Sequence, residues 1–228
     1  MAHQPHRAQG GPPLGVLGVV TTMLFLMGIV VSTVLADGST FPSPFGAEAE
    51  ILRHFTENRD AVKVNGFLHF ASAVPLAIYA ATASARLHNL GVRAPGATIA
   101  LAGGLLGAGM LALSGLFSWV LSRPEVLAEP ALVRALQDLA FATGGVGNVV
   151  FVGLLVAGIA VPGWLAGLLP RALAFTGLAI ALLAELSTLA LLVSDAAFLL
   201  PLARFPALLW LIASGFLLPR TCQKKVTA

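Results

Sequence analysis

The acidic residues of this chain are confined to alternate gaps between long apolar segments. Six segments are long enough to cross a bilayer, which takes about 20 residues at a rise of 1.5 Å each. All of the carboxylates except Glu185 lie in or at the edge of alternate connections, while the other connections and both tails carry none. This pattern predicts an all-α, polytopic membrane protein with a defined orientation.

The predicted spans cover residues 14–36, 64–86, 97–121, 138–160, 171–194 and 197–218. Pro201, Arg204 and Pro206 interrupt the first half of the sixth span, so a start near Arg204 is an alternative. The first span resembles a signal peptide, because Arg7 precedes it and residues 34–36 resemble a cleavage site. Its apolar stretch is longer than the usual signal segment of about 7–15 residues, which favours retention.

Composition excludes a soluble protein and gives no sign of a nucleic-acid partner. Apolar residues make up 57% of the chain and charged residues only 10%, against about 25% charged in soluble domains. The excess positive charge is scattered singly in loops and tails, where attraction to anionic lipid headgroups accounts for it. The single cysteine, Cys222, excludes an intrachain disulfide and a cysteine-clustered metal site.

Basic residues indicate which side of the membrane each loop faces. Of the 13 Lys and Arg residues, seven lie on the side of the termini. The bias strengthens when loop length is considered, because the opposite side includes the longest loop, 37–63. We therefore expect both termini in the cytoplasm, with one integral membrane domain over 1–228. A flexible tail at 1–13 and a basic tail at 221–228 are predicted to flank it.

The longest loop has two parts. Residues 37–46 hold prolines and glycines and are predicted to be irregular. Ile51, Leu52 and Phe55 follow at helical spacing among charged residues. This second part is therefore predicted to form a short amphipathic helix on the membrane surface or over the bundle.

Four spans carry small and polar residues at helical spacing, the pattern by which helices associate in lipid. These stripes are Asn65, His69, Ser72 and Tyr79; Gly103, Gly107, Ser114 and Ser118; Gln137, Gly144 and Asn148; and Gly177, Ala181, Ala184, Glu185 and Thr188. We expect spans two to five to form the centre of the bundle.

Glu185 is the only carboxylate inside a span. Because a charge at the bilayer centre costs about 2.5–3.5 kcal/mol on insertion scales, we expect it to face the bundle or a wet cavity. Counting along the helices places Glu185 about 14 Å deep, Asn148 about 16 Å and His69 about 8–9 Å, so a shared polar layer is plausible. Either Glu185 is a neutral clamp bonded to Asn148 or a backbone carbonyl, or it belongs to a solute or proton site. The candidate binding residues are Glu185, His69, Asn148, Asn65 and Thr188.

The chain lacks the sequence patterns of common catalytic and metal sites. It has no HExxH, no phosphate-binding GxxxxGK[ST] and no GxSxG. His69 is the one histidine within a span, whereas a haem-binding bundle would normally use two. No catalytic residue, metal or cofactor is therefore predicted. Asp195 and Arg204, near the turn between the last two spans, could pair with each other as a structural ion pair.

Five segments look like parts of a known protein group. They are FPSPF (41–45), NGFLHFASAVPLAIYAATASARL (65–87), RALQDLAFATGG (134–145), AELSTLALL (184–192) and PLARFPALLWLIASGFLLPR (201–220). Together they resemble small bacterial multi-pass membrane proteins of a domain-of-unknown-function class. The resemblance implies an inner-membrane helical bundle and assigns no reaction to any residue.

The sequence is compatible with three functions. The first is a non-enzymatic membrane protein whose outward-facing polar cavity binds or passes a small solute, a proton or a lipid. The second is a structural or regulatory subunit that packs against another membrane protein or against a second copy. The third is an intramembrane enzyme that uses Glu185 and His69 as acid and base, which requires both groups to reach one substrate atom.

Overall fold

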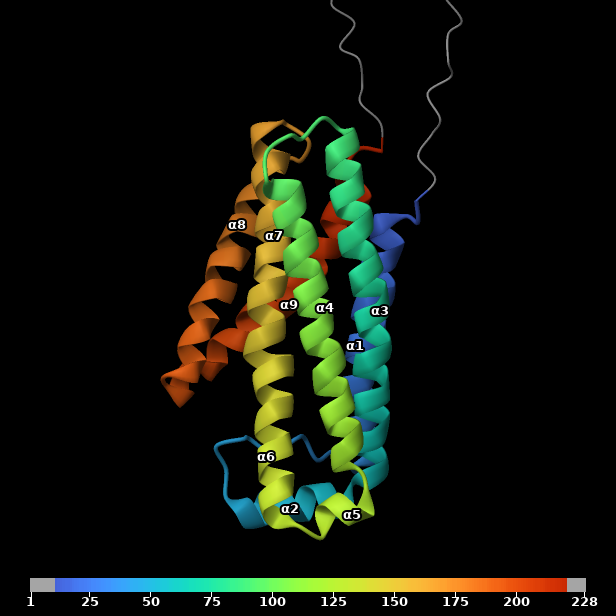
Figure 1. Cartoon of the computed structure of the whole chain (residues 1–228), viewed down its shortest axis with the longest axis vertical. Helices are drawn as coiled ribbons and strands as arrows, with labels where there is room; N and C mark the ends of the chain where they lie inside the picture. The colour runs from blue at the N-terminus through green and yellow to red at the C-terminus, as the bar shows by residue number, and fades with distance from the viewer. Residues whose placement is uncertain (1–10, 221–228) are drawn as a thin grey trace, which may run out of the picture.

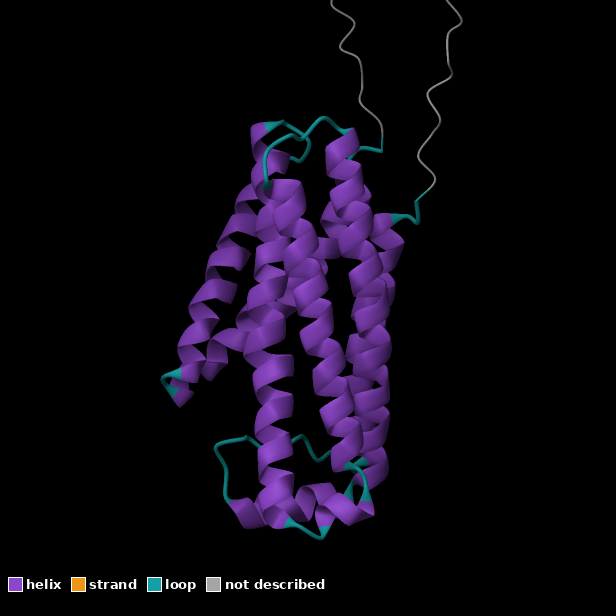
Figure 2. Cartoon of the chain, in the orientation of Figure 1, coloured by secondary structure: helices purple, strands orange, loops and turns teal. Residues whose placement is uncertain are grey.

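The computed structural model describes residues 11–220, so the predicted tail at 221–228 and most of the tail at 1–13 lie outside the described residues. Throughout the described part, the regular structure is helical (Figure 2). The elements are α1 (Leu14–Leu35), α2 (Glu48–Glu57), α3 (Arg59–Asn89), α4 (Gly96–Leu121), α5 (Pro124–Leu127), α6 (Pro130–Phe141), the π-helix η1 (Ala142–Gly147), α7 (Asn148–Leu165), α8 (Arg171–Leu186), the 3-10 segments η2 (Ser187–Leu191) and η3 (Ser194–Phe198), and α9 (Leu199–Leu217).

The structure confirms the prediction of six helices long and apolar enough to cross a membrane. They are Leu14–Leu35, Arg59–Asn89, Gly96–Leu121, Pro130–Leu165, Arg171–Leu191 and Ser194–Leu217. The fourth is longer than the predicted 138–160, because α6, η1 and α7 follow one another without a break. The sixth continues through Pro201 and Pro206. Pro201 lies in the first turn of α9, where the missing N–H would have had no intrahelical partner.

Five of the long helices form a ring, in which contacts run from α1 to α3, α4, α7, α9 and back to α1. The helix α8 lies outside the ring and packs mainly on α7 and α9. The prediction that spans two to five form the centre of the bundle is therefore wrong for the fifth span. Figure 1 shows α8 at the edge of the bundle, with α2 and α5 lying across one end. Both described chain ends lie at the opposite end (Figure 1). We call these two ends the α2 end and the terminal end.

Glycines let the central helices approach to backbone contact. A Cβ on Gly103 of α4 would lie 2.6 Å from the backbone nitrogen of Leu155 in α7. A Cβ on Gly66 of α3 would lie 2.6 Å from the carbonyl oxygen of Gly115 in α4. Close approach of this kind is the main source of helix association in lipid, so these seams fix α3, α4 and α7 against one another.

In the half of the bundle near the terminal end, which we call the terminal half, α1 and α9 also pack closely against each other. A Cβ on Gly18 of α1 would lie 3.2 Å from the backbone of Ile212 in α9. The Tyr79 hydroxyl of α3 is fully buried and lies 2.9 Å from the Leu211 carbonyl oxygen, to which it donates, and 3.1 Å from the Ser214 Oγ. The Tyr79 hydroxyl therefore ties α3 to α9 with its hydrogen-bonding capacity satisfied.

At the α2 end, the segment between α1 and α3 folds over the bundle. Ile51 and Phe55 of α2 are buried in a cluster with Val62, Leu121 and Val133. The loop before α2 is held by a hydrogen bond that Gln137 Nε2 donates to the carbonyl oxygen of Pro42, at 3.2 Å. The α2 helix thus covers the end of the bundle.

Candidate functional site

A cavity of about 850 Å³ lies in the half of the molecule near the α2 end, which we call the α2 half. Its walls come from α1, α3, α4, α6, η1, η3 and the first half of α9, and residues of the loop before α2 lie over it. Aromatic rings in the lining are Phe25, Phe41, Phe55, Phe141 and Phe205, and the polar side chains include Asn65, His69, Ser114, Ser118, Gln137 and Arg204. The volume is within the range of small-ligand sites, about 300–1,000 Å³.

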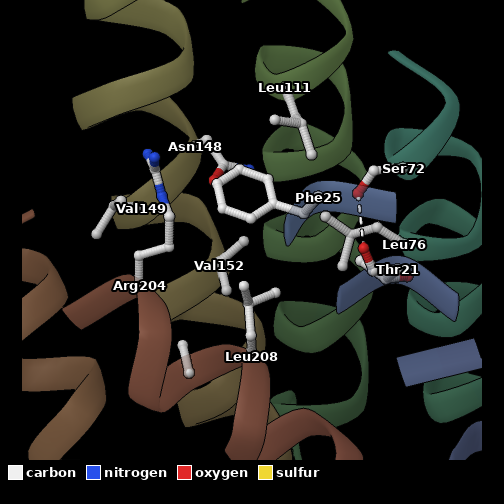
Figure 3. Close-up of a pocket in the computed structure, with 11 residues that line it drawn as sticks. Thr21, Phe25, Ser72, Leu76, Leu111, Asn148, Val149, Val152, Arg204 and Leu208 are labelled. Atoms are coloured by element: carbon white, nitrogen blue, oxygen red, sulfur yellow. Dashed lines mark hydrogen bonds between the residues drawn. The ribbon is translucent and has the colours of Figure 1, made fainter. Parts of the chain in front are cut away.

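Arg204 of α9 is the charged side chain in this lining. Its Nη2 donates to the carbonyl oxygens of Gly144 and Gly145 in η1, the latter at 3.2 Å. Its guanidinium carbon lies 5.3 Å from the centre of the Phe25 ring of α1, a distance suited to a cation–π contact. Figure 3 shows Arg204 rising from α9 toward α7 with the Phe25 ring beside it. The Arg204 Nε is buried and has no partner within the described residues.

The π-helix η1 explains why carbonyl oxygens are free to hold Arg204. A π-turn inserts one residue into the helical ladder and leaves a carbonyl without its usual backbone donor, and such turns are frequent at functional sites. Gly144 also lets α4 approach, because a Cβ there would collide with the Ser114 side chain. The sequence shows two glycines in an apolar run, but it does not reveal that Arg204, about 60 residues later, reaches their carbonyls.

His69 of α3 also contacts the Phe25 ring. The two rings are stacked, with centroids 4.8 Å apart and an angle of 10° between their planes. Phe25 therefore contacts both the imidazole of His69 and the guanidinium of Arg204. The His69 ring contacts Gly28 of α1, where a Cβ would lie 3.0 Å from His69 Cδ2. The His69 Nε2 is buried without a partner among the residues described.

Two further predicted site residues lie at or near the cavity. Asn65 is buried and lines it one helical turn before His69. Asn148 donates from its Nδ2 to the carbonyl oxygen of Gly107 at 2.9 Å, and thereby ties α7 to α4. It lines a smaller void of about 10 Å³, which is room for about one water. This void shares Phe25 and Arg204 with the cavity (Figure 3).

Glu185 and Thr188 do not join this site, and the expectation that Glu185 faces the bundle is wrong. Both side chains are exposed on α8 and η2, outside the ring of five helices. The buried stripe runs through Ala184, Ser187 and Ala190 because the helix tightens to 3-10 geometry, in which positions three apart share a face. Glu185, one residue beyond Ala184, is turned away, and the α-helical spacing that suggested Thr188 no longer holds.

The predicted pair between Asp195 and Arg204 is also wrong. Asp195 is exposed in η3, before α9 begins, whereas Arg204 turns inward to η1. The sequence places both residues near one turn, but two and a half helical turns separate them and rotate their side chains apart. Arg204 is thus the residue that sequence reasoning missed as part of a site. Its signal was a lone arginine between two prolines in an apolar segment.

His54 lies in α2, outside the membrane-spanning segments. We call α2 and the loop before it the cap, and His54 borders the cavity from this side. Its Nδ1 lies 3.3 Å from the Ser39 Oγ, and its ring lies 5.3 Å from that of Phe41. Burial lowers the pKa of His54 below the usual value for histidine, and the nearby carboxylate of Glu57 offsets part of this effect. The neutral imidazole is therefore the form that the folded cap favours.

Across residues 11–220, no group of three or more His, Cys, Asp or Glu side chains is placed to hold a metal ion. Comparison of this chain with models of known protein families, with curated proteins and with solved structures finds no match. The resemblance to small bacterial membrane proteins stays a prediction. The cavity is therefore the feature of the molecule that points to a function.

Proposed function

We propose that this chain is a non-enzymatic multi-pass membrane protein whose cavity binds, or passes on, a small amphipathic molecule. We further propose that it lies in a bacterial inner membrane with both termini in the cytoplasm, so that the cavity lies in the half of the bundle nearer the outer face. The excess of Lys and Arg on the terminal side supports this orientation.

The observation that carries the proposal is the mixed lining of the cavity. Aromatic and aliphatic side chains form most of the wall, and a few polar groups project from it. Three of these groups, His69 Nε2, Gln137 Oε1 and Arg204 Nε, lack a partner among the described residues. Buried polar groups are nearly always paired, so a site with unpaired ones suits a ligand that completes them.

The test is to fill the cavity and to compare the result with an equal change elsewhere. Ala197 lines the cavity and is half-buried, whereas Ala179 is exposed on α8. Detergent-purified wild type, Ala197→Trp and Ala179→Trp are extracted, and bound small molecules are measured by mass spectrometry. We expect wild type and Ala179→Trp to carry a bound amphiphile that Ala197→Trp has lost. Equal amounts in both variants, or none in wild type, would contradict the proposal.

A second candidate function is that of a subunit that packs against another membrane protein. Glu185 is exposed on α8 beside the exposed Leu182, Leu186 and Leu189. A carboxyl group on a lipid-facing helix is costly, so a protein partner that covers it would stabilise the assembly. Native mass spectrometry of wild type and Glu185→Leu tests this. A complex present only in wild type supports a partner, and monomers in both samples reject one.

A further inference from the structure

We propose that the ligand of this cavity is an amphiphile with an anionic head, a carboxylate or a phosphate, attached to an acyl chain. This inference rests on the binding function proposed above and assigns the chemistry of its ligand. Three features of the cavity carry it: its charge, the geometry of its cation and its side entrance.

The charge of the lining is one-sided. Arg204 contributes a half-buried positive charge whose Nε is buried, and no Asp or Glu from the described part of the chain lines the cavity with it. Its polar partners are two backbone carbonyls, which carry no formal charge. A buried cation is costly unless an anion accompanies it. The ligand is the group positioned to supply that anion.

The guanidinium is also held in a fixed orientation. Gly144 and Gly145 hold its Nη2, and the Phe25 ring faces its plane. The Nε edge remains unpaired. A guanidinium binds carboxylates and phosphates through donors in one plane, and a held side chain loses little entropy on binding. Asn65 and His69 line the same cavity and offer further hydrogen-bonding groups to the head.

The cavity opens sideways between α1 and α9. These helices touch through Gly18 and Ile212 in the terminal half. In the α2 half, the cavity lies between them instead, with Ile29 on α1 and Phe205 on α9 in its lining, both partly exposed. An apolar entrance on the side of a membrane bundle faces lipid, so a ligand that uses it brings an apolar chain.

The experiment compares probes that share one chain and differ in the head. Palmitate supplies a carboxylate, palmitoyl lysophosphatidate a phosphate, and monopalmitoylglycerol a neutral head. Binding to the detergent-purified full chain is measured by native mass spectrometry at several probe concentrations. We expect at least one anionic probe to bind about 10- to 100-fold more tightly than the neutral one, as charge-assisted hydrogen bonds allow. The two anionic probes distinguish a fatty acid from a phospholipid-derived ligand.

Variants assign the preference to Arg204. We expect Arg204→Met to abolish it and Arg204→Lys, which keeps the charge, to retain part of it. Arg171→Met, an exposed position at the start of α8, should retain all of it. Equal binding of neutral and anionic probes to wild type would overturn the inference. So would an undiminished preference in Arg204→Met. If that variant fails to fold, the wild-type comparison and Arg204→Lys decide.

The outcomes also separate this inference from the proposed function. Equal binding of all three probes that is lost in Ala197→Trp rejects the anionic head and leaves a cavity that binds amphiphiles. Probe binding that is the same in wild type and Ala197→Trp rejects the cavity as the site, and with it both proposals.

Discussion

The two halves of this bundle are built from the same helices but differ in how completely they are packed. In the terminal half, α1 and α9 meet at backbone contact, and the Tyr79 hydroxyl is paired on both sides. In the α2 half, the same helices diverge around a cavity of about 850 Å³. Among the described residues, buried polar atoms without a partner lie on Thr21, His54, His69, Gln137 and Arg204. These residues line or border the cavity or the small void beside it.

This contrast separates residues that hold the fold from residues available for a ligand. A polar group that is fully paired inside the protein has no capacity left for a ligand, whereas an unpaired one raises the free energy of the empty state. Arg204 belongs to both groups. Its Nη2 links α9 to η1, and its Nε stays free.

The largest effect is expected where two helices touch at backbone distance. Gly103→Ala places a Cβ 2.6 Å from the Leu155 nitrogen, while Gly109→Ala on the same helix meets nothing within 4 Å. Overpacking costs about 1–3 kcal/mol and more where backbone must move. The second change gains about 0.5–1 kcal/mol from helix propensity. Thermal unfolding in detergent measures both. Similar melting temperatures for the two variants would mean that the seam between α4 and α7 is not tight.

The long helices and most of their contact faces were predictable from the sequence, and the reason is physical. Spanning lipid requires long apolar runs, and close association requires small residues at helical spacing. Gly103, Gly107, Ser114 and Ser118 are all buried as their spacing predicted. Both requirements are local, so a single chain displays them.

The candidate site was predictable only in part, because it depends on departures from α-helical geometry. Asn65 and His69 were identified from an ordinary helical stripe. Glu185 and Thr188 were misplaced, because the change to 3-10 geometry at Ser187 is not visible in composition. Arg204 was missed because its partners are carbonyl oxygens freed by a π-turn. Such backbone irregularities arise from tertiary packing.

Tyr79→Phe tests the pairing in the terminal half. It removes a hydroxyl that bonds the Leu211 carbonyl oxygen and Ser214, and we expect a loss of about 0.5–1.5 kcal/mol. Thr176→Val is the matched control, because that exposed hydroxyl bonds only within its own helix. Unfolding in detergent measures both changes. If Tyr79→Phe is as stable as the control, the terminal half does not depend on this pairing.

Gly28→Ala repeats the glycine substitution in the α2 half. The new Cβ lies 3.0 Å from His69 Cδ2, a side-chain atom beside a cavity. The ring has room to move, so we expect a loss below about 1 kcal/mol, less than for Gly103→Ala. Ligand binding, measured by native mass spectrometry, should weaken because His69 shifts. A destabilisation equal to that of Gly103→Ala would show that both halves are equally rigid.

The smallest effect on stability is expected from the protonation of His54 in the cap when the pH falls. The folded state lowers the pKa of His54 because of burial, so below about pH 6.5 the unfolded chain binds more protons at this residue. Stability should therefore fall with decreasing pH from about 6.5 down to the folded-state pKa, and then level off. His54→Gln should reduce this slope in thermal unfolding scans between about pH 5 and 8. An unchanged slope would mean that His54 is not desolvated.

The central claim is that the α2 half contains an accessible cavity and that the terminal half is closely packed. Its most direct test is the reactivity of cysteines placed in each half. In a Cys222→Ser background, Ser118→Cys lines the cavity. Ser214→Cys replaces a buried side chain of the terminal half, whose Oγ lies 3.1 Å from the Tyr79 hydroxyl. With a maleimide reagent and native protein, we expect rapid labelling at position 118, slowed by a bound amphiphile, and protection at position 214. Equal protection of both thiols would contradict an accessible cavity in the α2 half.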